Sequence, residues 1–578
     1  MAGSNGKHPS PAEFPPPVDT QKEFIKRELD DEEERIDVGV AIVGGGTAGL
    51  ATANRLLQRL GNDPELLEQL GEVPVAVVEK AKTCGGHNLS GAVVRPGPLQ
   101  ELFPDLTRED WRKEGFAFGE VHKEAVYLTP TSKLALRIPP PPPFKNHGNE
   151  VISVAALARY QQAQAEEAGA YILTETAATQ LLVEDGKVRG VRSGDKGRGK
   201  DGEPLGNFEP GTDITAKATV LAEGCWGHIT GAAIREFDLA KGREPQVWEL
   251  GVKEVWKVPT ALNRLIHTIG PWPLSLSAKY GQIGGTWIYP MKNDKGEDLV
   301  SIGFVIDLEY ADATTSAHDL LQLFKTHPLV KKILEGGERV AWGAKALPGG
   351  GYWSMPKLTM PGALLVGDSA GMVDTVSLKG VHHCIKSGIL AGDAIYDTLK
   401  AGGTDLSAYE TAVEESSIGK ELYEVRNTRQ PFQKGFIKGA PLVNAMIATK
   451  GKFPGGRWAW HRNDEAPMFI GKTAKKYPKP DGKYIFDKLS SVYITGNATR
   501  DDAPNHIRVQ KRVPREIAET WKWMCPAGVY EIPEEAPETG PVDVIVNYTN
   551  CVQCGAITAK GGRLTTPEGG DGPLYQLT

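Results

Sequence analysis

The chain has 578 residues, of which 40% are hydrophobic and 24% are charged, and its formal net charge is -7. A chain of this length is expected to form two or three domains, and its mild acidity argues against a nucleic-acid-binding surface. No stretch reaches the roughly 18 consecutive apolar residues that a membrane-spanning helix needs, so any contact with a membrane is expected to be peripheral.

The first segment, residues 1–35, is rich in proline and then strongly acidic, ending in ELDDEEER. This composition predicts a disordered tail. The segment has no apolar signal core, and acidic residues follow soon after its start, so neither secretion nor mitochondrial import is expected. The sequence therefore favours a cytoplasmic protein.

Residues 36–120 are predicted to form the first part of a dinucleotide-binding domain. The run DVGVAIV reads as a buried strand, and Gly44, Gly46 and Gly49 form G-x-G-x-x-G before a helical pattern. In that context the glycines let the backbone approach a pyrophosphate at a helix N-terminus. A second apolar strand, Val75 to Val78, ends at Glu79, whose carboxylate is suited to bind the adenosine ribose. A plain glycine turn with a surface glutamate is the alternative.

Residues 121–350 are predicted to form a mixed region that includes a largely antiparallel sheet. The region contains shorter alternating runs with turn signals, including VISVAAL and KVRGVRSG. The segment WIYPMKNDKGEDLVSIGFVIDL is typical of a β-hairpin that turns around Asn293 to Gly296. We expect this second domain to be inserted into the first.

Two later glycine turns separate FAD from NAD as the bound dinucleotide. The run ATVLAEGC closes a strand on Glu223 and Gly224, and LLVGDSAG places Gly367, Asp368 and Gly371 on a turn before a helix around Val381 to Leu399. Both runs resemble elements of flavoproteins with two dinucleotide-binding folds, in which the Gly-Asp turn binds the ribityl and phosphate part of FAD. Three such turns in this order favour FAD.

The six cysteines are too few for a disulfide framework in so long a chain. Cys525, Cys551 and Cys554 lie together in the last tenth of the chain, and two of them form a C-x-x-C pair. Thiolates hold iron-sulfur clusters, so this trio is the candidate metal site. A zinc site of the Cys₃His type and simple structural thiols are the alternatives.

Many segments together resemble the electron-transfer flavoprotein:quinone oxidoreductase family. They run in family order from about residue 37 to the end of the chain: EKAKTCGGHNLSGAVV, KNHGNEVISV, AEGCWGH, GGERVAWGAKALPGGGYWSMPKL, KGVHHCIKSG, YPKPDGKYIFDKLSSVYITG, CPAGVYE and PEGGDGPLY. The resemblance implies an α/β fold with a two-dinucleotide-binding (Rossmann-like) FAD domain, an inserted antiparallel quinone domain and a small ferredoxin-like iron-sulfur module. It also implies peripheral docking on a membrane.

The resemblance implies further site residues. Lys80, Ser90 and Gly91 would contact the cofactor, and Asp374 and Val381 would replace an asparagine and a threonine that are common near the flavin. Our hypothesis is that these two changes lower the flavin potential, because a nearby carboxylate opposes added negative charge.

The strand GQIGGTWIYP resembles the quinone-binding strand of that family. Gly284 and Gly285 are therefore candidates for backbone contact with a quinone carbonyl, and a β-bulge at the same glycines is the alternative.

The cysteine pattern departs from the family at one position. The family continues as C-x-x-C-x-x-C, whereas this chain has Ile557 at the last position. Four readings therefore stay open: a [4Fe-4S] cluster with a ligand other than cysteine, a [4Fe-4S] cluster with an open iron, a three-iron cluster, or no cluster.

Membrane docking is expected from a basic amphipathic stretch, for which an ordinary half-buried helix is the alternative. Its apolar residues are Phe432, Phe436, Ile437, Leu442, Val443, Met446 and Ile447, and its basic residues are Lys434, Lys438, Lys450 and Lys452.

The sequence thus predicts a disordered tail (1–35), an FAD-binding domain in two parts (36–120 and 351–480, the second with the docking helices), the mixed region between them (121–350) and an iron-sulfur-type module (481–578). The predicted activity is electron transfer from a reduced electron-transfer flavoprotein to a membrane quinone through FAD, directly or through the cluster. It requires no general base or nucleophile, and the expected location is the cytoplasmic side of the cell membrane. A geranylgeranyl-reductase-like enzyme and a noncatalytic flavin-bearing membrane adaptor are the alternatives.

Overall fold

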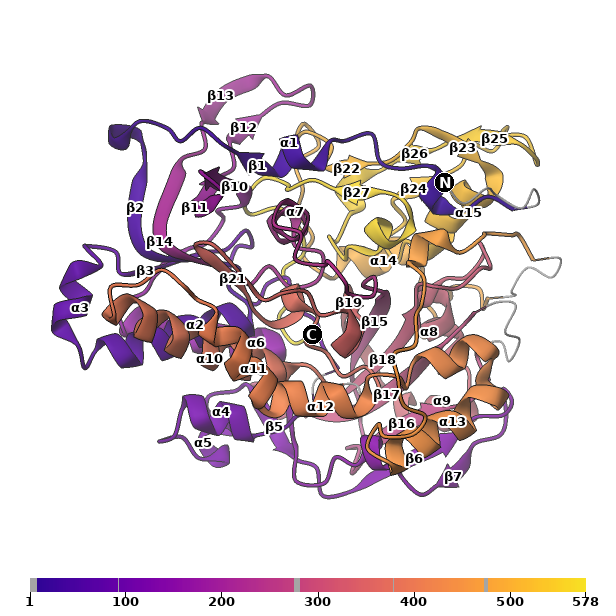
Figure 1. Cartoon of the computed structure of the whole chain (residues 1–578). Coiled ribbons are helices and arrows are strands. Elements are labelled where there is room, and N and C mark those ends of the chain that lie inside the picture. The colour runs from indigo at the N-terminus through magenta and orange to yellow at the C-terminus, as the bar shows by residue number, and fades with distance from the viewer. Residues whose placement is uncertain (1–7, 92, 275–280, 378, 472–476) are drawn as a thin grey trace.

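A computed structural model of the chain describes residues 8–91, 93–274, 281–377, 379–471 and 477–578. Figure 1 shows a sheet with its helices on one side of the molecule, a second sheet beside it, and a C-terminal module that packs above the second sheet. The FAD-type domain is discontinuous in sequence, because strands β2 and β21 lie in one sheet although more than 300 residues separate them.

The first sheet is the frame of the predicted dinucleotide domain. Its strand order is β1-β10-β11-β14-β2-β3-β9, with β21 also paired to β14 and β20 paired to β21. The strands are β1 (Ile25–Lys26), β2 (Ile36–Val43), β3 (Val75–Val78), β9 (Tyr171–Leu173), β10 (Ala178–Glu184), β11 (Lys187–Ser193), β14 (Asp213–Leu221), β20 (Thr359–Met360) and β21 (Ala363–Leu365). Because β14, β2, β3 and β9 run parallel, their carboxyl ends meet at one edge, where α/β folds bind ligands.

Helices pack on the first sheet. The long pair is α2 (Thr47–Leu60) and α10 (Val381–Lys400), which confirms the two predicted helices. They approach closely because a Cβ added at Gly388 would lie 2.5 Å from the carbonyl oxygen of Ala48. The other helices of this part are α3 (Pro64–Gln69), α4 (Gly97–Leu102), α5 (Arg108–Lys113), α6 (Val154–Glu167), α7 (His228–Glu236), α11 (Ala408–Glu415) and α12 (Ser417–Val425).

The N-terminal segment is ordered from residue 8, so the prediction of a disordered tail over residues 1–35 was wrong for its described part. Helix α1 (Thr20–Phe24) leads into β1, which pairs in parallel with β10. The Phe24 side chain is 1% exposed and stacks on His228. Burial of this aromatic ring outweighs the tendency of the proline-rich and acidic composition to stay solvated.

The second sheet confirms the predicted antiparallel region and the hairpin. Its strand order is β19-β15-β18-β17-β16-β6-β7, and all its described pairs are antiparallel except β16 with β6. The strands are β6 (Glu124–Leu128), β7 (Leu136–Ile138), β15 (Trp248–Lys257), β16 (Leu265–Ile269), β17 (Gly284–Lys292), β18 (Asp298–Asp307) and β19 (Glu338–Pro348). Asn293 accepts a hydrogen bond from the Gly296 N–H at the turn between β17 and β18.

Two expectations for residues 121–350 need correction. The run VISVAAL is a short strand, β8 (Glu150–Ile152), followed by helix α6, because the Ser153 hydroxyl accepts from the Ala156 N–H and caps the helix. In addition, β9, β10, β11 and β14 belong to the first sheet. The smaller sheet β4 (Val93–Val94), β8 and β5 (Ala117–Glu120) and the ribbon β12 (Lys196–Arg198) with β13 (Pro204–Glu209) complete this part.

The C-terminal module consists of short elements joined by long loops, as its composition predicts. Its longest helix is α15, Arg515–Met524, preceded by α14, Lys488–Tyr493. Three short strand pairs accompany them: β22 (Ile507–Arg508) with β27 (Arg563–Leu564), β23 (Arg512–Pro514) with β25 (Pro541–Asp543), and β24 (Tyr530–Glu531) with β26 (Ile545–Val546). The module shares one hydrophobic core with the second sheet, in which Trp521 and Trp342 are almost fully buried.

Candidate functional site

A cavity of about 290 Å³ opens at the carboxyl edge of the first sheet and extends between that sheet, the second sheet and the C-terminal module. The N-termini of three helices line it: Gly46 and Thr47 of α2, Gly227 and His228 of α7, and Gly380 and Val381 of α10. Among the residues that the structure describes, no side chain of an N-cap residue caps α2 or α10. Their first N–H groups and the positive ends of the helix dipoles are therefore free to bind an anion.

The first glycine motif is held in place by close backbone packing. Gly44 has φ +110°, and a Cβ there would lie 2.3 Å from the carbonyl oxygen of Ala222. A Cβ at Gly49 would lie 2.1 Å from the carbonyl oxygen of Gly44. Glu79 is buried at the cavity wall, and its carboxylate accepts the N–H groups of Gly45 and Ala81, both at 2.7 Å. The carboxylate thus fixes the turn and lies where a ribose is expected.

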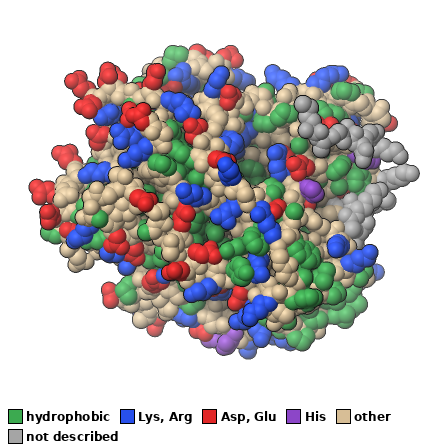
Figure 2. Space-filling view, in the orientation of Figure 1, with side chains coloured by type: hydrophobic (Ala, Val, Ile, Leu, Met, Phe, Trp, Pro, Cys, Tyr) green, Lys and Arg blue, Asp and Glu red, His purple; other side chains and the backbone are tan. Residues whose placement is uncertain are grey.

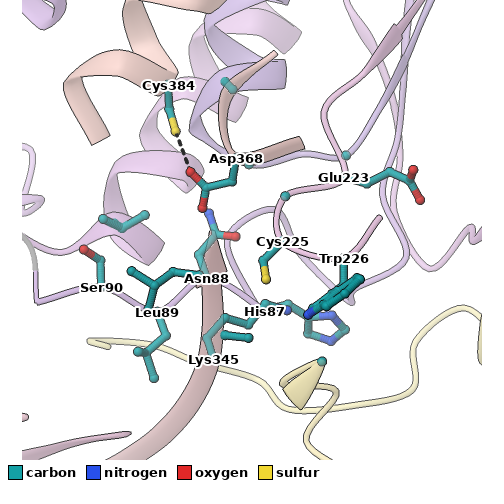
Figure 3. Close-up of a pocket in the computed structure, with 18 of the residues that line it drawn as sticks. His87, Asn88, Leu89, Ser90, Glu223, Cys225, Trp226, Lys345, Asp368 and Cys384 are labelled. Atoms are coloured by element: carbon teal, nitrogen blue, oxygen red, sulfur yellow. Dashed lines mark hydrogen bonds between the residues drawn. The ribbon is translucent and has the colours of Figure 1, made fainter. Parts of the chain in front are cut away.

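Several buried polar atoms in the cavity wall have no partner among the described residues. They are His87 Nδ1, Trp226 Nε1, His228 Nδ1 and Thr566 Oγ1. Buried donors and acceptors are normally paired, so these atoms indicate a polar ligand. In Figure 3, Trp226 and His87 lie at one end of the view and Asp368 with Cys384 lies toward the other. A cavity whose wall combines helix termini with unpaired polar groups fits a dinucleotide such as FAD.

Charged side chains from distant segments converge on this cavity. Lys80 donates to Gln553 Oε1 at 2.7 Å, and Lys345 donates to the carbonyl oxygen of Gln553 at 3.2 Å. Burial lowers the pKa of Lys80 to about 8. Asp368 accepts from the Cys384 thiol at 3.5 Å, and burial raises the pKa of its carboxyl. Two ammonium groups therefore lie between the cavity and the C-terminal module.

Of the fourteen predicted cofactor residues, ten line the cavity and four do not. Those in its wall are Gly44, Gly46, Glu79, Lys80, Ser90, Gly91, Glu223, Gly224, Asp368 and Val381. The Glu223 carboxylate points away from the other labelled side chains in Figure 3 and accepts the Thr230 N–H and hydroxyl, which caps α7. Asp374 is not in the wall: its carboxylate accepts the N–H groups of Val376 and Ser377.

The position of Asp374 weakens the hypothesis about the flavin potential. The Asp374 carboxylate is bonded into its own loop and is absent from the cavity wall, and Lys379 and Gly380 of the same loop line the cavity instead. Gly49, Gly367 and Gly371 do not line the cavity either, but Gly49 packs α2 on the strands. Gly371 has φ +76° and ends the 3₁₀ turn that presents Asp368.

The second sheet supplies the apolar side of the cavity. Trp287 and Tyr289 of β17, Val305 of β18 and Gly251 of β15 line it. Gly284 and Gly285 stand at the first residues of β17 and are absent from this wall. The register of β17 with β18 is regular through both glycines, so the alternative of a β-bulge was wrong. A Cβ at Gly285 would meet nothing within 4 Å, which leaves its face open.

The three predicted cysteine ligands surround a second, smaller cavity. Cys525 follows α15, Cys551 follows a 3₁₀ turn, and Cys554 precedes another. The Val529 N–H donates to Cys525 Sγ at 3.5 Å and the Gln553 N–H donates to Cys551 Sγ at 3.4 Å. Burial raises the pKa of all three thiols, that of Cys554 to about 12. Without a metal they are therefore protonated, and metal binding must release their protons.

The cysteines are not arranged around a single ion. Among the described residues, the three-ligand group whose atoms lie within 4.8 Å of one another is His382, His383 and Glu421, not the cysteine trio. That carboxylate also forms an ion pair with Arg95. The wider spacing of the thiols does not suit tetrahedral zinc. Three converging thiols with N–H donors fit an iron-sulfur cluster at three of its corners.

The two cavities adjoin each other. Gly555 and Leu564 belong to the walls of both. Gln553, Thr558 and Thr566 of the C-terminal module also line the larger cavity. These residues and Lys345 were not predicted from the sequence, because a contact between segments about 200 residues apart leaves no local signal. Lys345 lies inside GGERVAWGAKALPGGGYWSMPKL, a segment that carried the family resemblance, so the resemblance pointed to its neighbourhood.

Comparison with protein families matches most of the chain in order. An FAD binding domain matches residues 84–249, the family described as "ETF-QO, ubiquinone-binding" matches residues 248–347, and "Electron transfer flavoprotein-ubiquinone oxidoreductase, 4Fe-4S" matches residues 482–576. The second match coincides with β15 to β19, and the third with the C-terminal module.

Individual relatives agree with these matches. The mitochondrial electron transfer flavoprotein-ubiquinone oxidoreductase of Caenorhabditis elegans is 36% identical over 567 residues, which cover 93% of this chain and 91% of that protein. The electron transfer flavoprotein-ubiquinone oxidoreductase of Pseudomonas aeruginosa is 36% identical over 573 residues, which cover 94% of this chain and 99% of that protein. Among solved structures, a geranylgeranyl bacteriochlorophyll reductase-like protein from Thermoplasma acidophilum has a TM-score of 0.50 at 18% identity and covers 72% of this chain and 92% of that one. That likeness shows a shared fold alone.

Proposed function

The chain belongs to the electron transfer flavoprotein-ubiquinone oxidoreductase family, and on that premise we propose that it passes electrons from a reduced electron-transfer flavoprotein to a membrane quinone. It is an FAD-dependent oxidoreductase with an iron-sulfur module. The proposed activity needs no general base, since electron transfer depends on the placement and potential of the redox groups.

One observation carries the proposal. The cavity that fits FAD and the cavity that fits the cluster share Gly555 and Leu564 as wall residues. The two groups would therefore lie in adjoining cavities with a common wall. Such proximity is expected of consecutive electron carriers, whereas an enzyme that only saturates a carbon-carbon double bond would not require the second cavity.

The residues of this chain bind and orient the flavin. When bound, FAD supplies the redox chemistry. The backbone at Gly44 and Gly46 and the N-terminus of α2 would hold the pyrophosphate, Glu79 would hold the ribose, and the turn at Asp368 would hold the ribityl chain. Trp287 and Tyr289 close the apolar side and exclude water from it. Gly224 and Val381 complete the cofactor wall that we propose.

We assign the quinone to the second sheet, which the ubiquinone-binding family covers. The open face of Gly285 at the first residues of β17 is compatible with close approach of a planar carbonyl compound. Gly284 lies beside it, but a Cβ there would lie 2.2 Å from the carbonyl oxygen of Val305, so Gly284 chiefly serves strand packing.

The docking surface that we propose centres on α13 (Phe436–Ala448). Ile437 is 71% exposed and nearby Phe453 is 58% exposed, with Lys434 and Lys438 beside them. Figure 2 shows hydrophobic side chains gathered with Lys and Arg at the lower right, where α9 (Pro328–Leu334) and α13 lie in Figure 1. An exposed apolar patch with a basic rim suits an anionic lipid surface.

Other residues of the predicted stretch face inward. Val443 and Met446 are buried, Phe432, Leu442 and Ile447 are half-buried, Lys450 and Lys452 are exposed, and the Phe436 side chain lies outside those that the structure describes. The helix thus combines an inner packing face with an outer docking face. No helix among the described residues is long and apolar enough to span a bilayer. We place this peripheral surface on the cytoplasmic side of the cell membrane. Support comes from the six cysteines, which are all free thiols, as suits a reducing compartment.

The activity is tested by mixing the purified protein anaerobically with reduced electron-transfer flavoprotein and then with a soluble quinone analogue. The flavin absorbance should bleach on the first addition and recover on the second. Bound flavin that the donor does not reduce, or that the quinone analogue does not reoxidise, would instead indicate the noncatalytic adaptor.

A further inference from the structure

The wall of the cysteine cavity contains three thiols that can bind metal, and the rest of it is mostly aliphatic. Cys525, Cys551 and Cys554 all line it. The other lining side chains are aliphatic apart from the Met524 thioether and the Tyr530 phenol. A [4Fe-4S] cluster takes one cysteine thiolate for each of four irons. The cavity thus satisfies three corners of such a cluster.

Ile557 occupies the position where the C-x-x-C-x-x-C spacing would place the fourth thiolate. Its side chain lines the cavity and is 4% exposed. It is also held tightly, because a Cβ added at Gly562 would lie 2.5 Å from Ile557 Cγ1 and 2.8 Å from Val509 Cγ1. The Ile557 side chain therefore packs directly against the backbone of Gly562, beside Val509.

No other cysteine replaces the missing thiolate. Cys225 and Cys384 line the FAD cavity and not the cysteine cavity. Cys84 packs against the first glycine turn, where a Cβ at Gly45 would lie 2.4 Å from its sulfur. A water ligand at this corner would need two to four polar partners, whereas the lining side chains other than the thiols offer one hydroxyl, that of Tyr530. A fourth iron would thus be a buried cation with incomplete coordination, which is unfavourable.

We propose that this chain holds a three-iron cluster, in which Cys525, Cys551 and Cys554 each bind one iron and the corner that faces Ile557 carries none. The inference rests on the proposed function only in taking the C-terminal module as an iron-sulfur module. It differs from the four-iron cluster that the description of the matched family names. The cluster type also bears on the reduction potential of the centre.

The test compares the wild-type protein with Ile557→Cys after anaerobic reconstitution with excess ferrous iron and sulfide. The wild type should hold about three irons per FAD and should give an electron-paramagnetic-resonance signal when oxidised, since three ferric ions have an odd number of unpaired electrons. Ile557→Cys should gain about one iron, lose the signal of the oxidised state and acquire one on reduction. Ile557→Val is the matched control, because it changes the packing without adding a ligand, and it should behave as the wild type.

Two results would overturn the inference. One is a wild-type protein that holds four irons and gives no resonance when oxidised. In that case the variants Tyr530→Phe and Met524→Leu would show which side chain is the fourth ligand, because its loss would remove one iron. The other is a wild type that binds no iron in the presence of excess iron and sulfide. Bound FAD, measured in every sample, reports that each variant is folded. Donor-to-quinone turnover is measured separately, so failure of the proposed function would leave the iron count and the spectrum as an independent answer.

Discussion

The two adjoining cavities differ in the chemical groups that form their walls. On one side of the FAD cavity the wall consists of glycine turns and the N-termini of α2, α7 and α10, and on the other it consists of side chains of the second sheet such as Trp287 and Tyr289. The cysteine cavity depends on three thiol side chains, and one position of its motif carries Ile557. A backbone site tolerates exchange of many side chains as long as the turns are preserved, whereas a side-chain site changes its metal with a single substitution.

Because of this difference, the sequence predicts the ligand of the FAD cavity more directly than the metal of the cysteine cavity. The glycine turns at Gly44 and Gly367 keep the general flavoprotein pattern. At the cysteines one exchange removes a ligand. Four variants sharpen or break this contrast.

The largest effect is expected from Gly49→Val. The new Cβ would lie 2.1 Å from the carbonyl oxygen of Gly44 and 3.1 Å from Ile42 Cγ2, which would push α2 from the sheet and misplace its N-terminus. Purified protein should contain almost no FAD, and its free energy of unfolding should fall by about 3 kcal/mol. Gly97→Ala is the control, because a Cβ there meets nothing within 4 Å. Full FAD content in Gly49→Val would contradict a cavity built on close backbone packing.

Cys525→Ser should separate the two cavities. Cys525 lines only the cysteine cavity, so its loss should reduce bound iron at least about tenfold, as expected when one of few thiolate ligands is removed, with FAD unchanged. Iron and flavin are measured on the same sample. Cys84→Ala, which removes a buried thiol outside the cysteine cavity, should keep its iron. Equal loss of iron and FAD from Cys525→Ser would show that the two cavities are not independent.

Gly555→Val tests the wall that the cavities share. Its φ is +84°, and the added Cβ would lie 2.8 Å from Trp226 Cδ1. Backbone strain and the clash should cost about 1–3 kcal/mol, and both FAD and iron should decrease. Gly540→Val provides the control for strain alone, since its φ is +88° and nothing lies within 4 Å of its Cβ. If Gly555→Val loses neither cofactor, the shared wall is not as close as the structure shows.

The smallest effect concerns a buried charge behind the FAD cavity. Lys253 donates to the carbonyl oxygen of Ser90 at 2.9 Å, and burial lowers its pKa to about 7. Above pH 7 the unfolded chain keeps a proton that the folded chain releases, so the free energy of unfolding rises with pH until the lysine of the unfolded chain also titrates. Between pH 7 and 9 the wild type should gain about 2 kcal/mol relative to Lys253→Met. Denaturant unfolding at both pH values measures this gain, and parallel curves would contradict it.

Local motifs predicted the chemistry of both cavities. The glycine turns at Gly44 and Gly367, the hairpin at Asn293 and the cysteine trio each follow from short patterns whose geometry is decided by neighbours in sequence. The parallel strands and helices α2 and α10 also appear close to the expected residues.

The features that the sequence did not predict depend on contacts between distant segments. Phe24 is buried because its ring stacks on His228, some 200 residues away in the sequence. Composition alone does not reveal this contact. Asp374 satisfies its carboxylate within its own loop, so its charge does not reach the cavity wall. Gln553 reaches Lys80 because the C-terminal module folds back over the FAD cavity.

The most direct test of the account follows both centres in one sample. Reduced electron-transfer flavoprotein is added anaerobically to the protein, and the flavin absorbance and the electron-paramagnetic-resonance spectrum are recorded before and after a quinone analogue is added. Adjoining FAD and iron-sulfur centres predict that both signals change on reduction and that both return with the quinone. A protein with a full complement of FAD that shows no iron-sulfur signal in any oxidation state would contradict the account.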